Sequence, residues 1–215
     1  MHIPKIIHQV WIGPNKRPDC WMNSVRDFCR DFGYEYKLWD DAAVSYLHMV
    51  NHNFYHNEKS YHGKSDILRY EILYHYGGVY IDADSVIVRP EKFNTLLSEF
   101  KADAGFGFER DNELICGGVS ISIQHSKFMK SCILAIPKRD MNAAPWISIG
   151  PMLITDVFNK GGYTYGVTLY PSKTFYPISW HGIRTIDAHK TMNIPEESVM
   201  FQYGYSTNNL GEHIV

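Results

Sequence analysis

The chain has 215 residues and is 45% apolar, which is enough for one well-buried domain, and we expect residues 1–215 to form it. Its formal net charge of −2 gives no indication of a basic surface that would bind nucleic acid. The sequence has no window of about 18 apolar residues, which argues against a membrane-spanning helix.

The cysteines and the N-terminal residues indicate the cellular compartment in which the protein works. Cys20, Cys29, Cys116 and Cys132 show no metal-type spacing. Residues 3–12 form no signal-peptide core and instead have the pattern of a buried strand. Without a secretory signal, reduced thiols in a cytoplasmic protein are the simplest interpretation.

Apolar periodicity predicts alternating strands and helices along the chain. The expected strands cover residues 6–12, 34–39, 79–81, 85–88, 104–108, 119–123 and 169–170. The expected helices cover residues 20–32, 41–55, 65–76, 91–100, 127–135 and 150–158, and loops dominate after residue 175. This alternation predicts an α/β domain with a mainly parallel sheet.

The most informative segment runs from residue 65 to residue 84. Ser65 is a good N-cap, and we expect residues 59–63 to form a mobile loop that leads into it. The helix that follows has an apolar stripe and should end at Gly77 and Gly78. Asp66 and Arg69 are three residues apart on this helix and therefore share one face. A local surface ion pair of little energetic value is the alternative interpretation.

Two carboxylates, Asp82 and Asp84, follow where the next strand would end. Alternation along a strand sends both to the same side. Hard oxygen ligands at the carboxyl end of a strand in an open α/β sheet suit Mg²⁺ or Mn²⁺. A polar turn without a metal is the alternative, because Asp is common in turns.

These residues resemble the Asp-x-Asp sugar transferases of glycosyltransferase family 32. That family includes capsular-polysaccharide and Och1-like mannosyltransferases, and the glucosylating domains of the large clostridial toxins share its central block. The family pattern is Ser-Asp-x-x-Arg, a helix, then Gly-Gly-x-Tyr-x-Asp-x-Asp, and the chain carries every element from Ser65 to Asp84. The opening residues 3–13 and the later Gly150, Pro151 and Thr155 resemble the family too.

The resemblance implies a GT-A nucleotide-sugar fold with helices on both faces of a mainly parallel mixed sheet. It implies a metal-dependent glycosyltransferase that uses a nucleotide-diphosphate sugar and retains anomeric configuration, by front-side attack of a glycan or other hydroxyl acceptor. Asp84 would bind Mn²⁺ or Mg²⁺ directly, and Asp82 would act through water or hold the ribose. Asp66 and Arg69 would contact the donor sugar and its diphosphate. Och1-like relatives carry a membrane anchor and stem that this chain lacks, so we expect a minimal catalytic domain or a piece of a longer polypeptide.

Trp11 follows the first expected strand, beside a Gly-Pro turn. From the local pattern alone a core tryptophan is favoured. In the toxin relatives the matching tryptophan stacks on uracil, so the resemblance implies that Trp11 binds the base and that the donor is a UDP-sugar.

The C-terminal segment is expected to return to the metal. The resemblance makes Ser206 and Asn208 candidate metal ligands, with His181 and His189 in reserve, while Tyr203 stands where relatives have an acidic ligand. A disordered tail is the alternative.

Two further motifs remain open. Cys116, Gly117 and Gly118 occupy the stretch where relatives often present an asparagine to the sugar, and the glycines allow either close approach of a ligand or a bulge or turn. His48, His52 and His56 would line one helix face at i, i+4 and i+8, like a zinc site, but a solvated or acceptor-facing surface is favoured because no carboxylate or cysteine completes the set.

A non-catalytic nucleotide- or carbohydrate-binding module on the same fold is the second functional hypothesis, because a fold alone does not assign activity.

Overall fold

The computed structural model describes residues 2–179, 183–206 and 208–213. A six-stranded sheet forms its centre, in the order β2-β1-β3-β6-β5-β7. The strands are β1 (Ile6–Val10), β2 (Glu35–Trp39), β3 (Gly78–Ile81), β5 (Ala104–Arg110), β6 (Leu114–Ser122) and β7 (Val167–Tyr170). The β1–β2, β1–β3 and β5–β7 pairs are parallel, and β6 runs antiparallel to both of its neighbours. The predicted α/β class with a mixed, mainly parallel sheet is confirmed.

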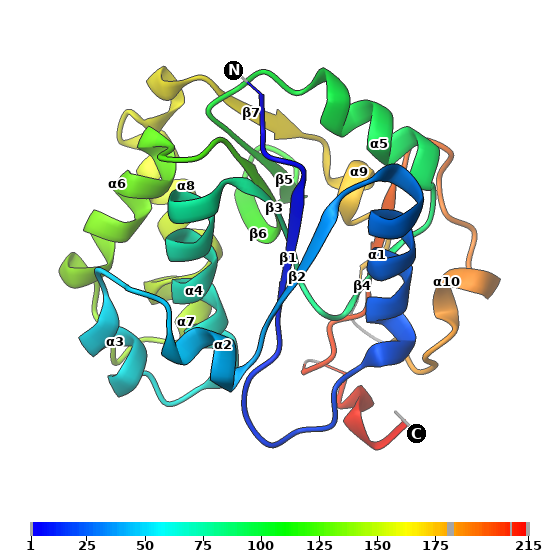
Figure 1. Ribbon diagram of the computed structural model, residues 1–215, viewed down its shortest axis with the longest axis horizontal. Coiled ribbons are helices and arrows are strands. Elements are labelled where there is room, and N and C mark those ends of the chain that lie inside the picture. Colours follow the sequence, from blue (N-terminus) through cyan, green and yellow to red (C-terminus); the bar gives the residue numbers. More distant parts are fainter. Residues whose placement is uncertain (1, 180–182, 207, 214–215) are drawn as a thin grey trace.

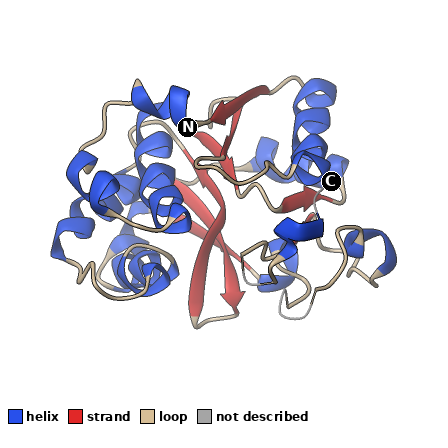
Figure 2. Cartoon of the chain, turned by 90° about the horizontal axis from the view of Figure 1, so that it is seen from below, coloured by secondary structure: helices blue, strands red, loops and turns tan. Residues whose placement is uncertain are grey.

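Helices cover both faces of the sheet (Figures 1 and 2). One layer contains α2 (Asp41–Ser45), α3 (His52–Asn57), α4 (Tyr61–Tyr76), α6 (Lys127–Ala135), α7 (Pro145–Ser148) and α8 (Pro151–Asn159). The other contains α1 (Asp19–Phe32), α5 (Pro90–Glu99), α9 (Ser172–Phe175) and α10 (Ala188–Thr191). Short 3₁₀ turns lie at η1 (Ile136–Lys138), η2 (Gly162–Tyr165) and η3 (Leu210–His213).

The central strand β3 shows why the sheet is buried on both sides. Val79 and Ile81 belong to the apolar cluster under α1 and α5, whereas Tyr80 belongs to the cluster under α4 and α8. All three are at most 1% exposed. A strand covered on both faces is apolar at every position, as this one is.

Helix α4 begins earlier than predicted, so the expected loop over residues 59–63 is wrong. Ser60 is the N-cap and its Oγ accepts from the Gly63 N–H at 3.1 Å. Ser65 lies inside the helix, where its Oγ donates to the Tyr61 carbonyl at 2.9 Å. A serine can satisfy its hydroxyl in either setting, so cap preference alone does not choose between the two.

The helix predicted over residues 41–55 is also wrong, because the chain breaks it into α2 and α3. The buried carboxylate of Glu71, on α4, accepts from the backbone N–H groups of Val50 (3.2 Å) and Asn51 (2.8 Å). Glu71 is about 20 residues away in the sequence from these two N–H groups, and the hydrogen bonds stabilise the non-helical segment between α2 and α3. His48 therefore lies outside α3, and the three histidines do not line one helix.

The two glycines after α4 are confirmed as its end. Gly77 and Gly78 have φ of 64° and 92°, which favour glycine. A Cβ on Gly78 would lie 2.4 Å from the carbonyl oxygen of Ile6. The glycine pair thus lets the chain turn from α4 straight into β3 beside β1.

Two features of the second half differ from prediction. Strand β6 begins at Leu114, earlier than predicted, and its register with β5 shifts between Cys116 and Ser120, which fits the bulge considered for Gly117 and Gly118. After α9, the chain forms β8 (Met200–Gln202), which pairs antiparallel with β4 (Ser85–Ile87). That pairing carries the C-terminal segment back to the end of β3.

Candidate active site

A cavity of about 210 Å³ lies where β1 and β3 end. These strands are parallel neighbours, so their carboxyl ends meet at one edge of the sheet. Residues from β1, α4, the β3–β4 turn and the C-terminal segment line it: Val10, Trp11, Ile12, Asn15, Tyr61, His62, Ser65, Asp66, Arg69, Tyr80, Asp82, Ala83, Asp84, Tyr205 and Ser206. Six of the seven predicted site residues therefore meet in one cavity.

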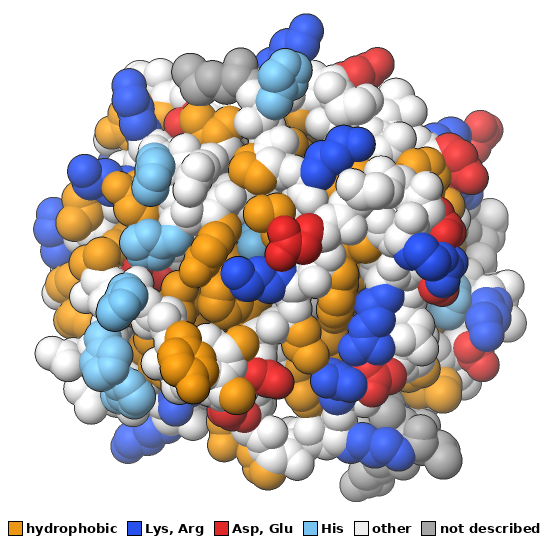
Figure 3. Space-filling view, in the orientation of Figure 1, with side chains coloured by type: hydrophobic (Ala, Val, Ile, Leu, Met, Phe, Trp, Pro, Cys, Tyr) orange, Lys and Arg blue, Asp and Glu red, His pale blue; other side chains and the backbone are white. Residues whose placement is uncertain are grey.

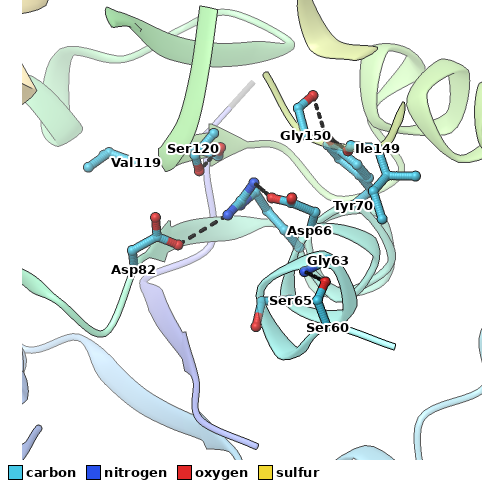
Figure 4. A network of polar contacts seen from close by, with 12 residues as sticks. Ser60, Gly63, Ser65, Asp66, Tyr70, Asp82, Val119, Ser120, Ile149 and Gly150 are labelled. Atoms are coloured by element: carbon cyan, nitrogen blue, oxygen red, sulfur yellow. Dashed lines mark hydrogen bonds and ion pairs between the residues drawn. The ribbon is translucent and has the colours of Figure 1, made fainter. Parts of the chain in front are cut away.

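Arg69 joins helix α4 to the end of strand β3. Its Nη1 lies 2.6 Å from Asp66 Oδ1 and its Nη2 lies 3.1 Å from Asp82 Oδ1, and the dashed lines that reach these carboxylates in Figure 4 mark the two contacts. The Arg69 side chain is 5% exposed and lies over the Tyr80 ring. The surface ion-pair interpretation is therefore wrong, and the three residues form a buried charge-assisted network.

Three glycines leave room for this network. A Cβ on Gly117 would lie 2.4 Å from Arg69 Nη1, and one on Gly118 would lie 2.8 Å from Asp82 Oδ2. A Cβ on Gly150 would lie 2.9 Å from Asp66 Oδ2. The Tyr70 hydroxyl donates to the Ile149 carbonyl at 2.7 Å and fixes that loop against α4. The glycines in residues 116–118 thus face charged side chains of the chain itself.

The two aspartates after β3 both accept hydrogen bonds from the C-terminal segment. The Asp82 N–H donates to the Gly118 carbonyl at 2.8 Å, and its Oδ2 accepts from Gln202 Nε2 at 3.2 Å. Asp84 Oδ2 accepts from the Tyr205 N–H at 2.8 Å. Burial, together with the negative charge of Asp82, raises the pKa of Asp84 to about 6. Burial also raises the pKa of Asp66, although Arg69 opposes the shift.

Charge in this cluster is unbalanced. Three carboxylates, Asp66, Asp82 and Asp84, share one guanidinium, so the cluster carries two excess negative charges when all are ionised. A divalent cation would balance that excess. In the part of the chain that the structure describes, no group of three His, Cys, Asp or Glu side chains is placed to hold a metal. A cation here would therefore rest on the aspartate pair and take further ligands from water or phosphate oxygens.

Gln202 is a site residue that sequence reasoning missed. Strand β8 delivers it to Asp82, and its Oε1 is buried with no hydrogen-bond partner among the described residues. An unpartnered buried acceptor beside two carboxylates fits a bound cation. The apolar run at residues 199–201 was the available signal for a strand.

Trp11 is in the cavity wall and not in the core. It is half-buried, its Nε1 donates to the Asn15 carbonyl at 2.9 Å, and its ring meets Tyr205 edge-on at 5.4 Å. Its indole ring therefore lines the cavity beyond the end of β1.

The C-terminal candidates separate into two groups. Ser206 is exposed and lines the cavity. Asn208 does not line it, because its Nδ2 donates to the Tyr203 carbonyl at 2.8 Å and its Oδ1 accepts from Arg184 at 3.4 Å. Tyr203 is buried and stacked on Trp21, and it bonds His189 through its hydroxyl. His181 lies outside the described residues.

A family model described as "Glycosyltransferase sugar-binding region containing DXD motif" matches residues 15–102. Residues 15–102, less than half of the chain, are therefore similar to this sugar-binding region. The match includes Asp66, Arg69, Asp82 and Asp84, so the predicted resemblance to Asp-x-Asp sugar transferases is confirmed.

Relatives of this glycosyltransferase region bear transferase and synthase names. Inositol phosphoceramide mannosyltransferase 1 of Schizosaccharomyces pombe is 36% identical over 99 residues, which are 41% of this chain and 30% of that protein. Mannosyl phosphorylinositol ceramide synthase CSH1 of Saccharomyces cerevisiae is 39% identical over 88 residues, 38% of this chain and 23% of that protein. Lactosylceramide 4-alpha-galactosyltransferase of Rattus norvegicus is 27% identical over 130 residues, 54% of this chain and 32% of that protein. The chain spans less than a third of the length of each.

Two solved structures share the fold. PaToxG glycosyltransferase superposes with a TM-score of 0.54 at 15% identity, over 74% of this chain and 68% of that one. A glycosyltransferase involved in glycosylation of the major capsid of PBCV-1 superposes with a TM-score of 0.55 at 12% identity, over 98% of this chain and 100% of that one. The predicted GT-A fold is confirmed. Among the described residues, no helix is both long and apolar enough to cross a membrane.

Proposed function

We propose that this chain is a metal-dependent retaining glycosyltransferase that moves a sugar from a nucleotide-diphosphate sugar to a glycan or other hydroxyl acceptor. The observation that carries the proposal is the buried network in which Arg69 bridges Asp66 and Asp82 beside Asp84. It combines a charge excess suited to a divalent cation with a cavity open to a ligand. Residues 1–215 act as one catalytic domain.

The aspartate pair would hold Mn²⁺ or Mg²⁺, which neutralises charge on a leaving diphosphate as a Lewis acid. Asp84 would be the direct ligand, and Asp82 would act through water or on the ribose, because Arg69 already engages one of its oxygens. Ser206, Asn208 and Gln202 are the candidate additional ligands. Of these, Ser206 reaches the cavity as folded, while Asn208 would have to release Tyr203.

Asp66 and Arg69 form the sugar end of the donor site. A carboxylate accepts hydrogen bonds from sugar hydroxyls, and a guanidinium offers donors to anionic oxygens. Because Arg69 also fixes Asp82, it sets the distance between the sugar end and the metal end. Retention then requires the acceptor hydroxyl to approach from the side of the leaving diphosphate. On that side, a phosphate oxygen of the donor itself would accept the hydroxyl proton.

Trp11 forms the base end, where it stacks on a pyrimidine, so the proposed donor is a UDP-sugar. The names of the relatives, mannosyl- and galactosyltransferases, support a hexose as the transferred sugar. GDP-sugars are the competing donors, and the experiment below distinguishes them.

We also propose that the domain works in the cytoplasm, alone or as part of a longer polypeptide. The four cysteines are unpaired, and three of them are buried. Free thiols fit a reducing compartment.

A donor screen tests the proposed function. Purified protein with Mn²⁺ is incubated with UDP- and GDP-linked hexoses, and free nucleotide is measured without an acceptor. We expect slow release of UDP from one UDP-hexose, lost on chelation. Binding of UDP with no release from any donor would instead identify the non-catalytic module.

A further inference from the structure

A second groove, of about 470 Å³, lies between the C-terminal end of α3 and the segment that leads into α7. Its walls come from residues 54–59 and from residues 141–145. The first wall continues directly into Tyr61 and His62, which line the donor cavity. The second wall ends at Pro145, whose carbonyl accepts from the Gly150 N–H at 2.8 Å. The second wall therefore ends close to Gly150.

Gly150 lies at the sugar end of the donor site. A Cβ on Gly150 would lie 2.9 Å from Asp66 Oδ2 and 3.2 Å from the Pro145 carbonyl, so these two oxygens are no more than about 6 Å apart. One wall of the groove therefore lies close to Asp66.

The groove has the chemistry of a site for a neutral sugar. Phe54, Met141 and Pro145 are half-buried and give an apolar floor, while the amides of Asn57 and Asn142 are exposed along it. Amides both donate and accept, as hydroxyl groups require. Its two charged residues have opposite sign. An apolar surface with a few polar groups and no net charge is typical of a small-ligand site.

We propose that this groove binds a neutral saccharide as the acceptor, an assignment that rests on the proposed function. In the transfer, an acceptor hydroxyl oxygen forms a bond to the sugar's anomeric carbon as the bond from that carbon to the diphosphate oxygen breaks. The hydroxyl proton passes to the released diphosphate. No co-reactant is needed.

The test compares two readouts from one set of variants. The parent, Asn57→Ala, Asn142→Ala and the exposed control Asn193→Ala are given the competent donor, Mn²⁺ and an array of neutral oligosaccharides. We expect the groove variants to raise the KM for the acceptor at least tenfold, with acceptor-independent UDP release within twofold of the parent and the control unchanged.

The outcomes distinguish failure of the acceptor assignment from failure of the proposed function. If no donor is hydrolysed at all, the proposed function fails. If donor is hydrolysed but transfer reaches only phosphorylated or lipid-linked acceptors, or none, the neutral saccharide is wrong. If transfer occurs and the groove variants keep the parental KM, the acceptor binds elsewhere.

A separate observation concerns the outer face of α3. His side chains gather over this helix at the left edge of the molecule in Figure 3. His52 and His56 are exposed, one helical turn apart, and their Nε2 atoms lie 3.0 Å from each other. Two nitrogen ligands at 2.0–2.1 Å from a metal and at right angles are about 2.9 Å apart. A metal can therefore replace the proton that the two rings share.

We infer that His52 and His56 form a chelating site for Ni²⁺, Cu²⁺ or Zn²⁺, distinct from the aspartate pair. Imidazole prefers these ions, whereas carboxylate oxygens suit Mg²⁺ and Mn²⁺. Water completes the coordination. Clamping positions i and i+4 also stabilises α3, which at six residues is short for a helix.

Calorimetry of the untagged protein with NiCl₂ at pH 7.5 tests this site. We expect one equivalent of Ni²⁺ to bind, at least tenfold weaker in His52→Ala and in His56→Ala, and unchanged in the exposed control His48→Ala. Equal affinity in the parent and both pair variants, or an equal loss in His48→Ala, would overturn the assignment.

Discussion

Arg69 on helix α4 lies 3.1 Å from Asp82 after strand β3, through a guanidinium that is nearly enclosed. The same guanidinium holds Asp66 at 2.6 Å. Gly77 and Gly78 turn the chain directly from the helix into the strand. This turn brings Arg69 and Asp82, which are 13 residues apart in the sequence, into contact. This contact links the proposed sugar end of the cavity to the proposed metal end.

Substitution of Arg69 should therefore affect both activity and stability. Arg69→Ala leaves buried carboxylates unpaired, which typically costs about 3–5 kcal/mol of unfolding free energy. Turnover on a competent donor should fall at least about tenfold, equivalent to about 1.4 kcal/mol. Arg69→Lys keeps a charge but not two diverging donors, so it should recover stability better than turnover.

Urea unfolding and initial-rate kinetics measure these two effects. Arg30→Ala, which removes an exposed arginine with two aspartate partners, is the matched control and should change stability by about 0–1 kcal/mol. Parental rates and parental stability in Arg69→Ala would contradict the assigned role.

Gly117 should tolerate no side chain while Arg69 is present. Its Cβ would lie 2.4 Å from Nη1 and 3.0 Å from Cζ of that arginine. We expect Gly117→Ala to lower the free energy of unfolding by about 1–3 kcal/mol, the usual cost of overpacking. A double-mutant cycle with Arg69→Ala is the check, because the alanine should cost little once the guanidinium is gone. Additive losses would place the clash elsewhere.

Trp11 should bind the base with little role in folding. Loss of one aromatic stack costs about 1–3 kcal/mol, so Trp11→Ala should weaken UDP by that amount while Trp11→Phe retains most of the affinity. Titration with UDP and GDP measures this, and Trp146→Ala, at a tryptophan outside the cavity, is the control. If Trp11→Ala lowers the melting temperature but leaves UDP affinity unchanged, the base lies elsewhere.

The metal-free protein should lose stability as the pH rises through the range in which Asp84 ionises. Its pKa is raised to about 6, against about 3.9 in an unfolded chain. Between these values the folded state holds a proton that the unfolded state has lost, so the free energy of unfolding falls as the pH rises from about 4 to about 6. Asp84→Asn removes this penalty.

Thermal unfolding in EDTA measures the effect. The melting temperature of Asp84→Asn should exceed that of the parent at pH 7.5 and equal it at pH 4. The exposed control Asp27→Asn should have the parental melting temperature at both pH values. Coincident pH profiles of the parent and Asp84→Asn would show that burial does not shift this carboxyl.

Removal of the Asp84 carboxylate should abolish Mn²⁺-dependent UDP binding while the fold remains. A divalent site that loses a direct carboxylate ligand loses most of its affinity. Calorimetry of Asp84→Ala with UDP, with and without Mn²⁺, is the measurement, and circular dichroism controls for folding. Parental UDP affinity in Mn²⁺ would make Asp84 a turn residue only.

The arrangement of residues 65–84 could be predicted because it depends on contacts between residues that are close together in the sequence. A helix that ends at Gly77 and continues at once into a strand must lie beside that strand, so Arg69 and Asp82 had to be near each other. Their burial was not predictable from this block. It depends on Gly117, Gly118 and Gly150, whose missing side chains leave the space that the charged groups fill.

Long-range partners explain the remaining differences. Gln202 meets Asp82 across 120 residues because β8 pairs with β4, and neither strand is long enough to give a clear periodic signal. The break between α2 and α3 depends on Glu71, which caps backbone groups of a distant segment. Local propensity contains no information on either contact.

The central claim is that Asp82 and Asp84 hold a divalent cation against a nucleotide diphosphate. Anomalous diffraction from crystals grown with MnCl₂ and UDP locates the metal directly. We predict one manganese peak within about 2.5 Å of an Asp84 carboxylate oxygen and in contact with the diphosphate. Density for UDP in the cavity with no manganese at these aspartates, or a manganese bound only elsewhere, would contradict the account.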